Sequence, residues 1–476
     1  MISLLRRGVG GVGLVALGLS ASGCGGDSGM RVSNLETPSA GKSQSSDPAL
    51  AIVPGSGDLM LSWIEGDGKV WGLYTARSTD GGARWSSPVR VAGGAGAPDE
   101  VHPHGESSPR LVVGPRNRMA LVWPNSIVVP GRKWPAAMLR LARSGDGGLH
   151  WSNPITLNDD TTRAPVSHQF HGAAWVGDSG LTVAWLDERE AATPPASGPD
   201  GHGAHAAEPD ASIYLASSPD FGRSWGANRL AWKAACPCCR VSLARGGDGR
   251  AVAAWRQHFP GNVRDVVTAL VGDRSSEPQR IHPDNWAYAG CPHTGPAIAT
   301  GRDGTAHVTW YTGKEGMLGV YYARQTPGGG AGPAVDLVTG RGLGVAHPAV
   351  VALPDGGALA AYDVAADGKG RISLARLLPG GRLAGRLVVE GSEDGKYPQL
   401  AVLNDSVAVV GWTASNGDTQ GMRLARVRLP PASSVIPSPP LASRLDALPY
   451  ASSRRPRFRP NAGAHGERDR RAKPRH

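Results

Sequence analysis

The sequence predicts an all-β fold in which a four-stranded unit repeats around a ring. Short apolar stretches with period-2 alternation recur between residues 46 and 430, and turns rich in Gly, Asp and Pro separate them. The second stretch of each repeat carries a large aromatic residue, and these residues are Trp63, Trp123, Trp185, Trp255, Trp310, Tyr362 and Trp412. Their spacing of 50 to 70 residues accommodates four strands, as in the blades of a β-propeller. We therefore expect a seven-bladed β-propeller of four-stranded antiparallel blades within residues 46–430.

An octapeptide of the pattern Ser-x-Asp-x-Gly-x-x-Trp follows the third stretch in each of the first three repeats. Ser and Asp oxygens accept hydrogen bonds from the backbone of a tight turn, Gly permits a positive φ, and Trp covers the hairpin. The pattern residues are Ser78, Asp80, Gly82 and Trp85; Ser144, Asp146, Gly148 and Trp151; and Ser218, Asp220, Gly222 and Trp225. We interpret the three octapeptides as structural turns that fix the strand register.

The octapeptide resembles the Asp box, or BNR repeat, of bacterial sialidases and related β-propellers. With its C-P-C-C-R segment at 236–240 and its G-C-P-H-T-G-P segment at 290–296, the chain looks like an exported lipoprotein branch of that sialidase-like family. The resemblance implies a six-bladed propeller as the alternative to seven blades. Sialidases use an arginine triad, a Tyr–Glu pair and an Asp acid, and no such set can be placed on this sequence. The catalytic residues, and whether the chain is an enzyme, therefore stay unknown.

The N-terminus indicates export. Residues 1–23 have a charged start and a short apolar stretch, as in a signal peptide, and they end before Cys24 in a segment that resembles a lipobox. The resemblance implies that Cys24 is lipidated and that the membrane of the bacterial cell envelope is a partner. Residues 24–45 are then a lipid-anchored linker, in which 31–35 is expected to supply a strand that closes the ring and covers an exposed sheet edge.

The C-terminal residues 431–476 form a basic tail rich in Pro and Arg. It holds ten of the basic residues and three of the acidic ones, so it carries most of the formal charge of +10. This composition is typical of disorder, although contact with an anionic surface is an alternative. Because the body is close to neutral, the charge predicts no nucleic-acid partner. A propeller of this length buries its own core, so we expect a monomer.

The face opposite the Asp boxes is expected to carry the function, because the longest loops lie there. Counting back from Trp185, Trp255 and Trp310 places His168, Cys238 and His293 at one position in three consecutive blades. The expected result is a Cys/His cluster at the mouth of the central channel.

Three interpretations of this cluster remain open. The four cysteines after Cys24 favour disulfides in an exported protein, with Cys236 and Cys291 as the first pair. A soft-metal site is the second interpretation, because thiolate and imidazole ligands suit copper or zinc. Its candidate ligands are Cys238, Cys239, His293 and His168. In the third interpretation the histidines are satisfied polar groups within packed loops.

Further residues on the same face are candidates for ligand binding, namely Asp187, Arg189, Arg240, Arg264, Asp265, Trp286 and Tyr288. Arginines and aromatics around a channel suit an anionic ligand, and salt bridges between loops explain them equally well. The sequence thus predicts a cell-envelope lipoprotein that binds a small molecule, glycan, protein or metal at the channel mouth. The alternatives are a sialidase-like hydrolase of anionic sugars and a scaffold for a protein partner.

Overall fold

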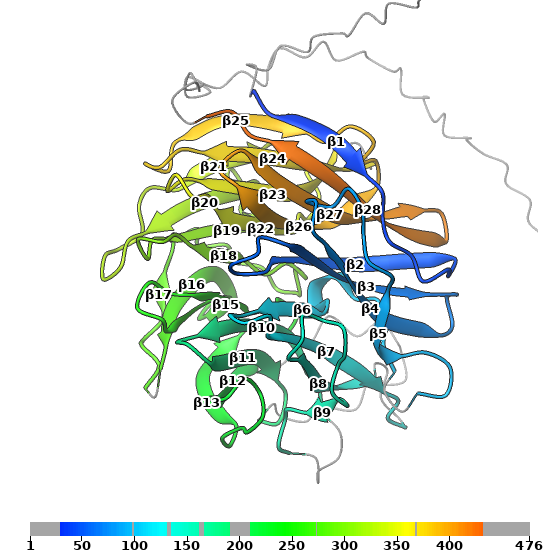
Figure 1. Ribbon diagram of the computed structural model, residues 1–476. Coiled ribbons are helices and arrows are strands. Elements are labelled where there is room, and N and C mark those ends of the chain that lie inside the picture. The colour runs from blue at the N-terminus through cyan, green and yellow to red at the C-terminus, as the bar shows by residue number, and fades with distance from the viewer. Residues whose placement is uncertain are drawn as a thin grey trace, which may run out of the picture. The chain divides into compact units, whose positions relative to one another are not determined.

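The computed structural model of the chain describes residues 29–97, 100–130, 135–160, 166–190, 210–272, 274–366 and 369–431 (Figure 1). These residues belong to the first of two compact units, Met1–Ser438 and Pro439–His476. The expected signal peptide at 1–23, Cys24 and all but the first residue of the expected tail lie outside the described residues. Among the described residues, no helix is long and apolar enough to cross a membrane.

The described chain is all-β apart from one turn of 3-10 helix, η1 (Gly105–Ser107). The strands of its first half are β1 (Arg31–Leu35), β2 (Gln44–Ile52), β3 (Leu59–Gly66), β4 (Trp71–Ser78), β5 (Val89–Gly93), β6 (Arg110–Val113), β7 (Met119–Ile127), β8 (Ala136–Ser144), β9 (Ile155–Thr156), β10 (His168–Val176), β11 (Gly180–Asp187), β12 (Ala211–Ser218) and β13 (Arg229–Ala235).

The second half continues the same alternation of strands and turns. Its strands are β14 (Ser242–Arg245), β15 (Ala251–Phe259), β16 (Val263–Val271), β17 (Gln279–Arg280), β18 (Ala297–Thr300), β19 (Ala306–Thr312), β20 (Gly319–Gln325), β21 (Val335–Thr339), β22 (Pro348–Ala352), β23 (Ala358–Ala366), β24 (Lys369–Leu377), β25 (Leu383–Val388), β26 (Gly395–Asn404), β27 (Val407–Asn416) and β28 (Thr419–Arg428).

The described strands form six antiparallel sheets. Five of them have four strands, and the sixth has eight, because β10–β13 and β14–β17 join through the single pair Ala235 and Gln257. The strand at Arg31–Leu35 pairs with β28, so the first and last described strands lie side by side (Figure 1). The innermost strands β2, β6, β10, β14, β18, β22 and β26 contact one another in a closed cycle around a central channel. This arrangement is a β-propeller.

The seven aromatic residues that mark the repeats lie on the second strand of each four-strand group. All seven side chains are at most 1% exposed. They fill the space between neighbouring groups; for example, Trp185 of β11 shares a core cluster with Ala120 and Val122 of β7. Burying a side chain of this size contributes roughly 2–3 kcal/mol, so these residues hold the groups together.

The Asp boxes form tight turns between the third and fourth strands of the first three groups. In the first box, Oγ of Ser78 accepts a hydrogen bond from the Gly82 backbone N–H at 2.8 Å, and Oδ1 of Asp80 accepts one from the Arg84 N–H at 2.8 Å. The second and third boxes repeat both bonds. Because strand direction alternates, connections between one group and the next lie on the opposite face.

Candidate functional site

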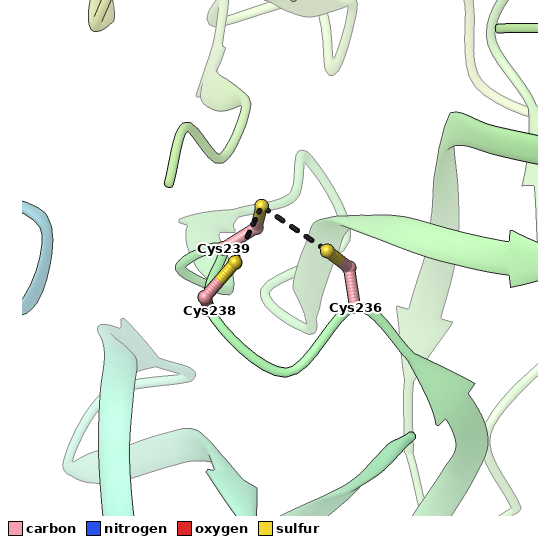
Figure 2. A group of neighbouring side chains, drawn as sticks. All are labelled: Cys236, Cys238 and Cys239. Atoms are coloured by element: carbon pink, nitrogen blue, oxygen red, sulfur yellow. Dashed lines mark hydrogen bonds between the residues drawn. The ribbon is translucent and has the colours of Figure 1, made fainter. Parts of the chain in front are cut away.

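Three cysteines lie together in the turn that joins β13 to β14. The sulfur of Cys239 is 3.4 Å from that of Cys236 and 3.9 Å from that of Cys238, and the three sulfurs lie within 4.8 Å of one another (Figure 2). All three side chains are buried. The backbone N–H of Cys236 donates to the carbonyl of Arg256 at 2.9 Å, which fixes the turn to β15.

The three thiols have different electrostatic surroundings. Hydrogen bonds from the neighbouring thiols, assisted by the charge of Arg264, hold the pKa of Cys236 well below its ordinary value. The guanidinium Nη1 of Arg264 lies 3.0 Å from the Cys236 sulfur. Burial raises the pKa of Cys238 and Cys239. The surroundings therefore favour the thiolate form at Cys236 and the neutral thiol form at Cys238 and Cys239.

The fourth described cysteine, Cys291, packs at the margin of this cluster. It is partly exposed and lies close enough to hydrogen-bond with Cys236. The thiols of Cys236 and Cys291 are therefore neighbours, and the disulfide expected between them stays a prediction.

Three of the candidate ligand-binding residues support the wall of the cysteine cluster. Asp265 accepts backbone hydrogen bonds from Asn285 at 3.1 Å and Trp286 at 3.2 Å, which shapes the loop before β18. Within that loop Trp286 stacks on Tyr288, and the Tyr288 carbonyl accepts a hydrogen bond from Nε of Arg264 at 2.8 Å. These residues therefore position Arg264 against Cys236.

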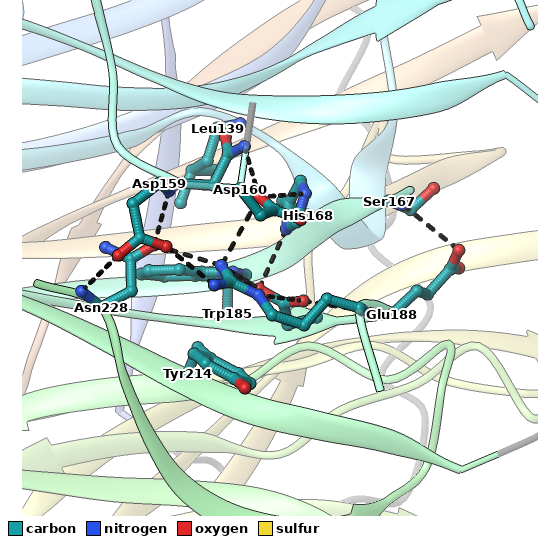
Figure 3. Close-up of polar contacts among 12 residues, drawn as sticks. Leu139, Asp159, Asp160, Ser167, His168, Trp185, Glu188, Tyr214 and Asn228 are labelled. Carbon is teal, nitrogen blue, oxygen red and sulfur yellow. Dashed lines mark hydrogen bonds and ion pairs between the residues drawn. The ribbon is translucent and has the colours of Figure 1, made fainter. Parts of the chain in front are cut away.

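His168 lies in a different cluster, with two carboxylates (Figure 3). Its Nδ1 is 3.0 Å from Asp187 and its Nε2 is 3.2 Å from Asp160. Asp187 also accepts hydrogen bonds from Trp185 at 2.8 Å and from Arg189. Burial acts to raise the pKa of Asp187, but the hydrogen bonds from His168 and Arg189 bring it below its ordinary value.

Strand register explains why His168 and Cys238 do not share a position. His168 pairs with Asp187, two residues after Trp185, and Ala235 pairs with Gln257, two residues after Trp255. The next matched pairs are Gly172 with Ala184 and Ser242 with Ala254. Four residues separate His168 from Gly172, whereas seven separate Ala235 from Ser242. The three additional residues form the cysteine turn, so counting back from the tryptophans misaligns it.

His293 likewise belongs to another environment. It is exposed and has a positive φ of 50°. Its backbone carbonyl, and not its ring, is contacted by Nε2 of His347 at 3.2 Å. The structure therefore brings Cys238 and Cys239 together with Cys236, and not with the two histidines.

The channel mouth is crossed by an ion pair that sequence reasoning missed. Glu106 of η1 is 1% exposed, and its carboxylate accepts hydrogen bonds from the guanidinium and backbone N–H of Arg240 and from the Gly295 N–H. Arg240 also donates to the carbonyl of Pro348. This pair ties four separate groups of the ring together, so Arg240 is already satisfied. The signal available in the sequence was one acidic residue in a Gly/Ser loop.

Other titratable groups surround this pair. Burial raises the pKa of Asp47 to about 6, against the opposing effects of the His104 N–H and the charge of Arg110. His347 lies 2.7 Å from Asp363 and packs on Tyr397 with 4.1 Å between ring centroids. A cavity of about 160 Å³ lies along the channel and is lined by Arg110, Arg240 and residues of the innermost strands. The cavity volume suits a small ligand only.

No protein-family profile matches the sequence, and no curated protein matches it. Several solved structures have a similar fold. A protein of unknown function from Dyadobacter fermentans superposes with a TM-score of 0.50 at 15% identity, covering 84% of this chain and 100% of that one. The Hadza microbial sialidase Hz136 gives 0.45 at 15% identity, covering 83% of this chain and 67% of that one. The α-L-arabinofuranosidase Arb93A from Fusarium graminearum superposes with a TM-score of 0.46 at 11% identity, covering 85% of this chain and 98% of that one.

The sheet arrangement defines the class of protein as a β-propeller, and the Dyadobacter fermentans structure shares this fold. At such identities the similarity concerns the fold, so the chemistry of the site has to be argued from this chain's own residues.

Proposed function

We propose that this protein is an exported, lipid-anchored propeller of seven blades that binds a soft metal ion through Cys236, Cys238 and Cys239. The closed cycle of seven innermost strands supports the blade count, with the eight-stranded sheet counted as two blades. Lipidation at Cys24 rests on the sequence pattern alone.

The observation that carries the proposal is the meeting of three buried sulfurs within 4.8 Å. Thiolates prefer soft or borderline ions such as Cu(I) and Zn(II) over Mg²⁺ or Ca²⁺. The turn that presents these thiols is anchored to β15 by backbone hydrogen bonding, so the donors are held in place before an ion arrives. It connects two blades and therefore lies on the face opposite the Asp boxes.

Anaerobic titration of the reduced full chain with Cu(I) and with Zn(II), each against a chromophoric chelator, tests the proposal. We expect one ion per chain for the wild type and loss of at least 100-fold in affinity for Cys238→Ser and Cys239→Ser. His168→Gln is the matched control, because His168 was the other candidate ligand, and it should bind as the wild type does. Absence of stoichiometric binding by chains whose four thiols are all reduced would overturn the proposal.

A second candidate function, hydrolysis of an anionic sugar, is favoured by the raised pKa of Asp47 at the channel mouth. A buried carboxyl with a pKa of about 6 suits a general acid, and Arg110 lies within electrostatic reach of it. Turnover of a fluorogenic sialoside that is abolished in Asp47→Asn would support this function. Equal rates of sialoside turnover for the wild type, Asp47→Asn and buffer alone would rule out this second function.

A further inference from the structure

Two buried arginines beside the cysteine turn lack a carboxylate partner. Arg256 is 1% exposed and Arg264 is 2% exposed. Arg256 donates to the backbone carbonyls of Thr294 at 3.2 Å, Arg264 at 2.7 Å and Tyr311 at 2.7 Å. Neither arginine forms an ion pair with a carboxylate among the residues that the structure describes. Carbonyls satisfy the N–H groups of a guanidinium but do not neutralise its charge.

The nearest acidic neighbour in the sequence, Asp265, is already used. It lies next to Arg264 on β16, and consecutive strand residues point to opposite faces. Its carboxylate is paired with Arg280 at 3.1 Å and with two backbone N–H groups. A buried charge without a counter-ion costs several kcal/mol, so the counter-ions of Arg256 and Arg264 have to come from another group.

The thiols are the anionic groups that these arginines reach. Arg264 contacts the Cys236 sulfur at 3.0 Å, and the charge of Arg256 acts on Cys239. When three thiols bind a monovalent ion as thiolates, the site carries two negative charges. Two guanidinium groups balance that site. The same three thiolates around a divalent ion carry one net negative charge. The two positive charges of the arginines are more than that site needs for neutrality.

The number of sulfurs favours the same ion. The sulfurs of Cys236, Cys238 and Cys239 lie within 4.8 Å of one another and are buried, whereas Cys291, next to Cys236 and Cys238, is partly exposed. Structural Zn(II) sites take four ligands in a tetrahedron. Three thiolates suit Cu(I), which is soft and needs no fourth donor.

We propose that the cysteine turn is a three-coordinate Cu(I) site whose charge is neutralised by Arg256 and Arg264, with Cys291 outside the ligand set. This inference rests on the proposed metal binding and names the ion and the residues that select it. Because the Cu(I) site carries twice the net charge of the Zn(II) site, each arginine stabilises bound Cu(I) more than bound Zn(II).

The test compares Arg264→Gln with Arg264→Lys in the full chain, titrated separately with Cu(I) and Zn(II). Arg264→Gln should weaken Cu(I) binding about 100-fold and Zn(II) binding about 10-fold, since the interaction scales with net charge. Arg264→Lys, which keeps the charge, should restore most of both. Circular dichroism and the melting temperature identify any variant that fails to fold. If one does, the Cu(I) and Zn(II) affinities of Arg256→Lys and Arg264→Lys are compared with those of Cys291→Ser.

Cys291→Ser supplies an independent readout that does not depend on the arginines. X-ray absorption at the copper edge should show three sulfur ligands in both the wild type and Cys291→Ser, with equal affinity. Four sulfurs, or a loss of Cu(I) affinity in Cys291→Ser, would overturn the inference while leaving metal binding intact. Equal weakening of both ions by Arg264→Gln would overturn the charge argument, whereas a wild type that binds neither ion would overturn the proposed function itself.

Discussion

The cysteine turn and the His168 network each bring three potential metal ligands within 4.8 Å, yet they differ in how their charges are compensated. In the network, Asp187 accepts hydrogen bonds from His168, Trp185 and Arg189, and Arg189 also pairs with Asp159. Among the buried side-chain atoms of the described residues in this network, Oδ2 of Asp160 alone lacks a hydrogen-bond partner. In the cysteine turn, two guanidinium groups lie beside thiols and no described carboxylate. The two clusters therefore have the same number of potential ligands, but only the cysteine turn lies beside guanidinium charges that no described carboxylate balances.

The position of the cysteine turn adds to this contrast. It follows the single pairing of Ala235 with Gln257 that joins two strand groups into one eight-stranded sheet. The turn replaces the start of an innermost strand, whereas His168 begins β10 and already pairs with Asp187 of β11, ahead of a bulge between Gln169 and Gly172. An ion held by the turn would lie where two neighbouring blades join, and the His168 network also links two blades, through Asp159 and Asp160 after β9.

The largest expected effect on folding comes from the His168 network. Asp187→Ala leaves His168, Trp185 and Arg189 without their shared acceptor, and we expect a loss of roughly 3–5 kcal/mol in the free energy of unfolding. Urea denaturation of the metal-free chain measures it. Cys238→Ser, measured in the same way, should cost about 1 kcal/mol. A larger loss of unfolding free energy for Cys238→Ser than for Asp187→Ala would show that the cysteine turn, and not the His168 network, stabilises the metal-free fold.

Metal binding should stabilise the fold through the cysteine turn alone. At a free Cu(I) concentration 1,000 times Kd, the free energy of unfolding should rise by about 4 kcal/mol. The increase should persist in His168→Gln and disappear in Cys239→Ser, as read from the melting temperature with and without the ion. An increase that is lost in His168→Gln would place the ion in the His168 network and contradict binding at the cysteine turn.

Asp47 offers a third kind of buried charge, one that is only partly compensated. Its pKa is raised from 3.8 to about 6, so between these values the folded chain holds a proton that the unfolded chain has lost. The stability from this group is present below about pH 4 and falls by about 3 kcal/mol as the pH rises through 6. Asp47→Asn should flatten that fall in denaturation curves measured from pH 4 to 7. Unchanged curves would show that Asp47 is fully compensated.

The smallest effect is expected at an Asp box, where every group is satisfied and no function is assigned. Ser78→Ala removes the acceptor of the Gly82 N–H and should cost about 1 kcal/mol. Metal affinity should not change, because the turn lies on the opposite face. Altered Cu(I) binding in this variant would show that the two faces are coupled.

The sequence allowed much of the fold to be predicted and little of the site. The alternation of strands, the octapeptide turns and the seven buried aromatics follow from local patterns, and Trp185 and Trp255 occupy equivalent positions on their strands. The site depends on distant parts of the chain. Glu106 meets Arg240 across the channel, 134 residues away, and no spacing reports such a contact.

The cysteine cluster was predicted in part. The sequence predicts Cys238 and Cys239 as ligands, but it predicts a disulfide for Cys236 and adds the two histidines to the metal site. His168 is misplaced because the turn after Ala235 is three residues longer, which shifts the numbering relative to β10. His293 does match Cys238 in register, but its side chain is exposed and lies in another environment. The pairing of strands reveals such an insertion, and counting from a single tryptophan does not.

Site-resolved alkylation of the four thiols, read by mass spectrometry with and without Cu(I), tests the central claim most directly. The full chain is labelled in a urea concentration at which all four thiols of the metal-free chain react. We predict that one Cu(I) per chain protects Cys236, Cys238 and Cys239 and leaves Cys291 reactive. Protection of all four thiols, of none, or a Cys236–Cys291 disulfide in the purified chain would contradict the account.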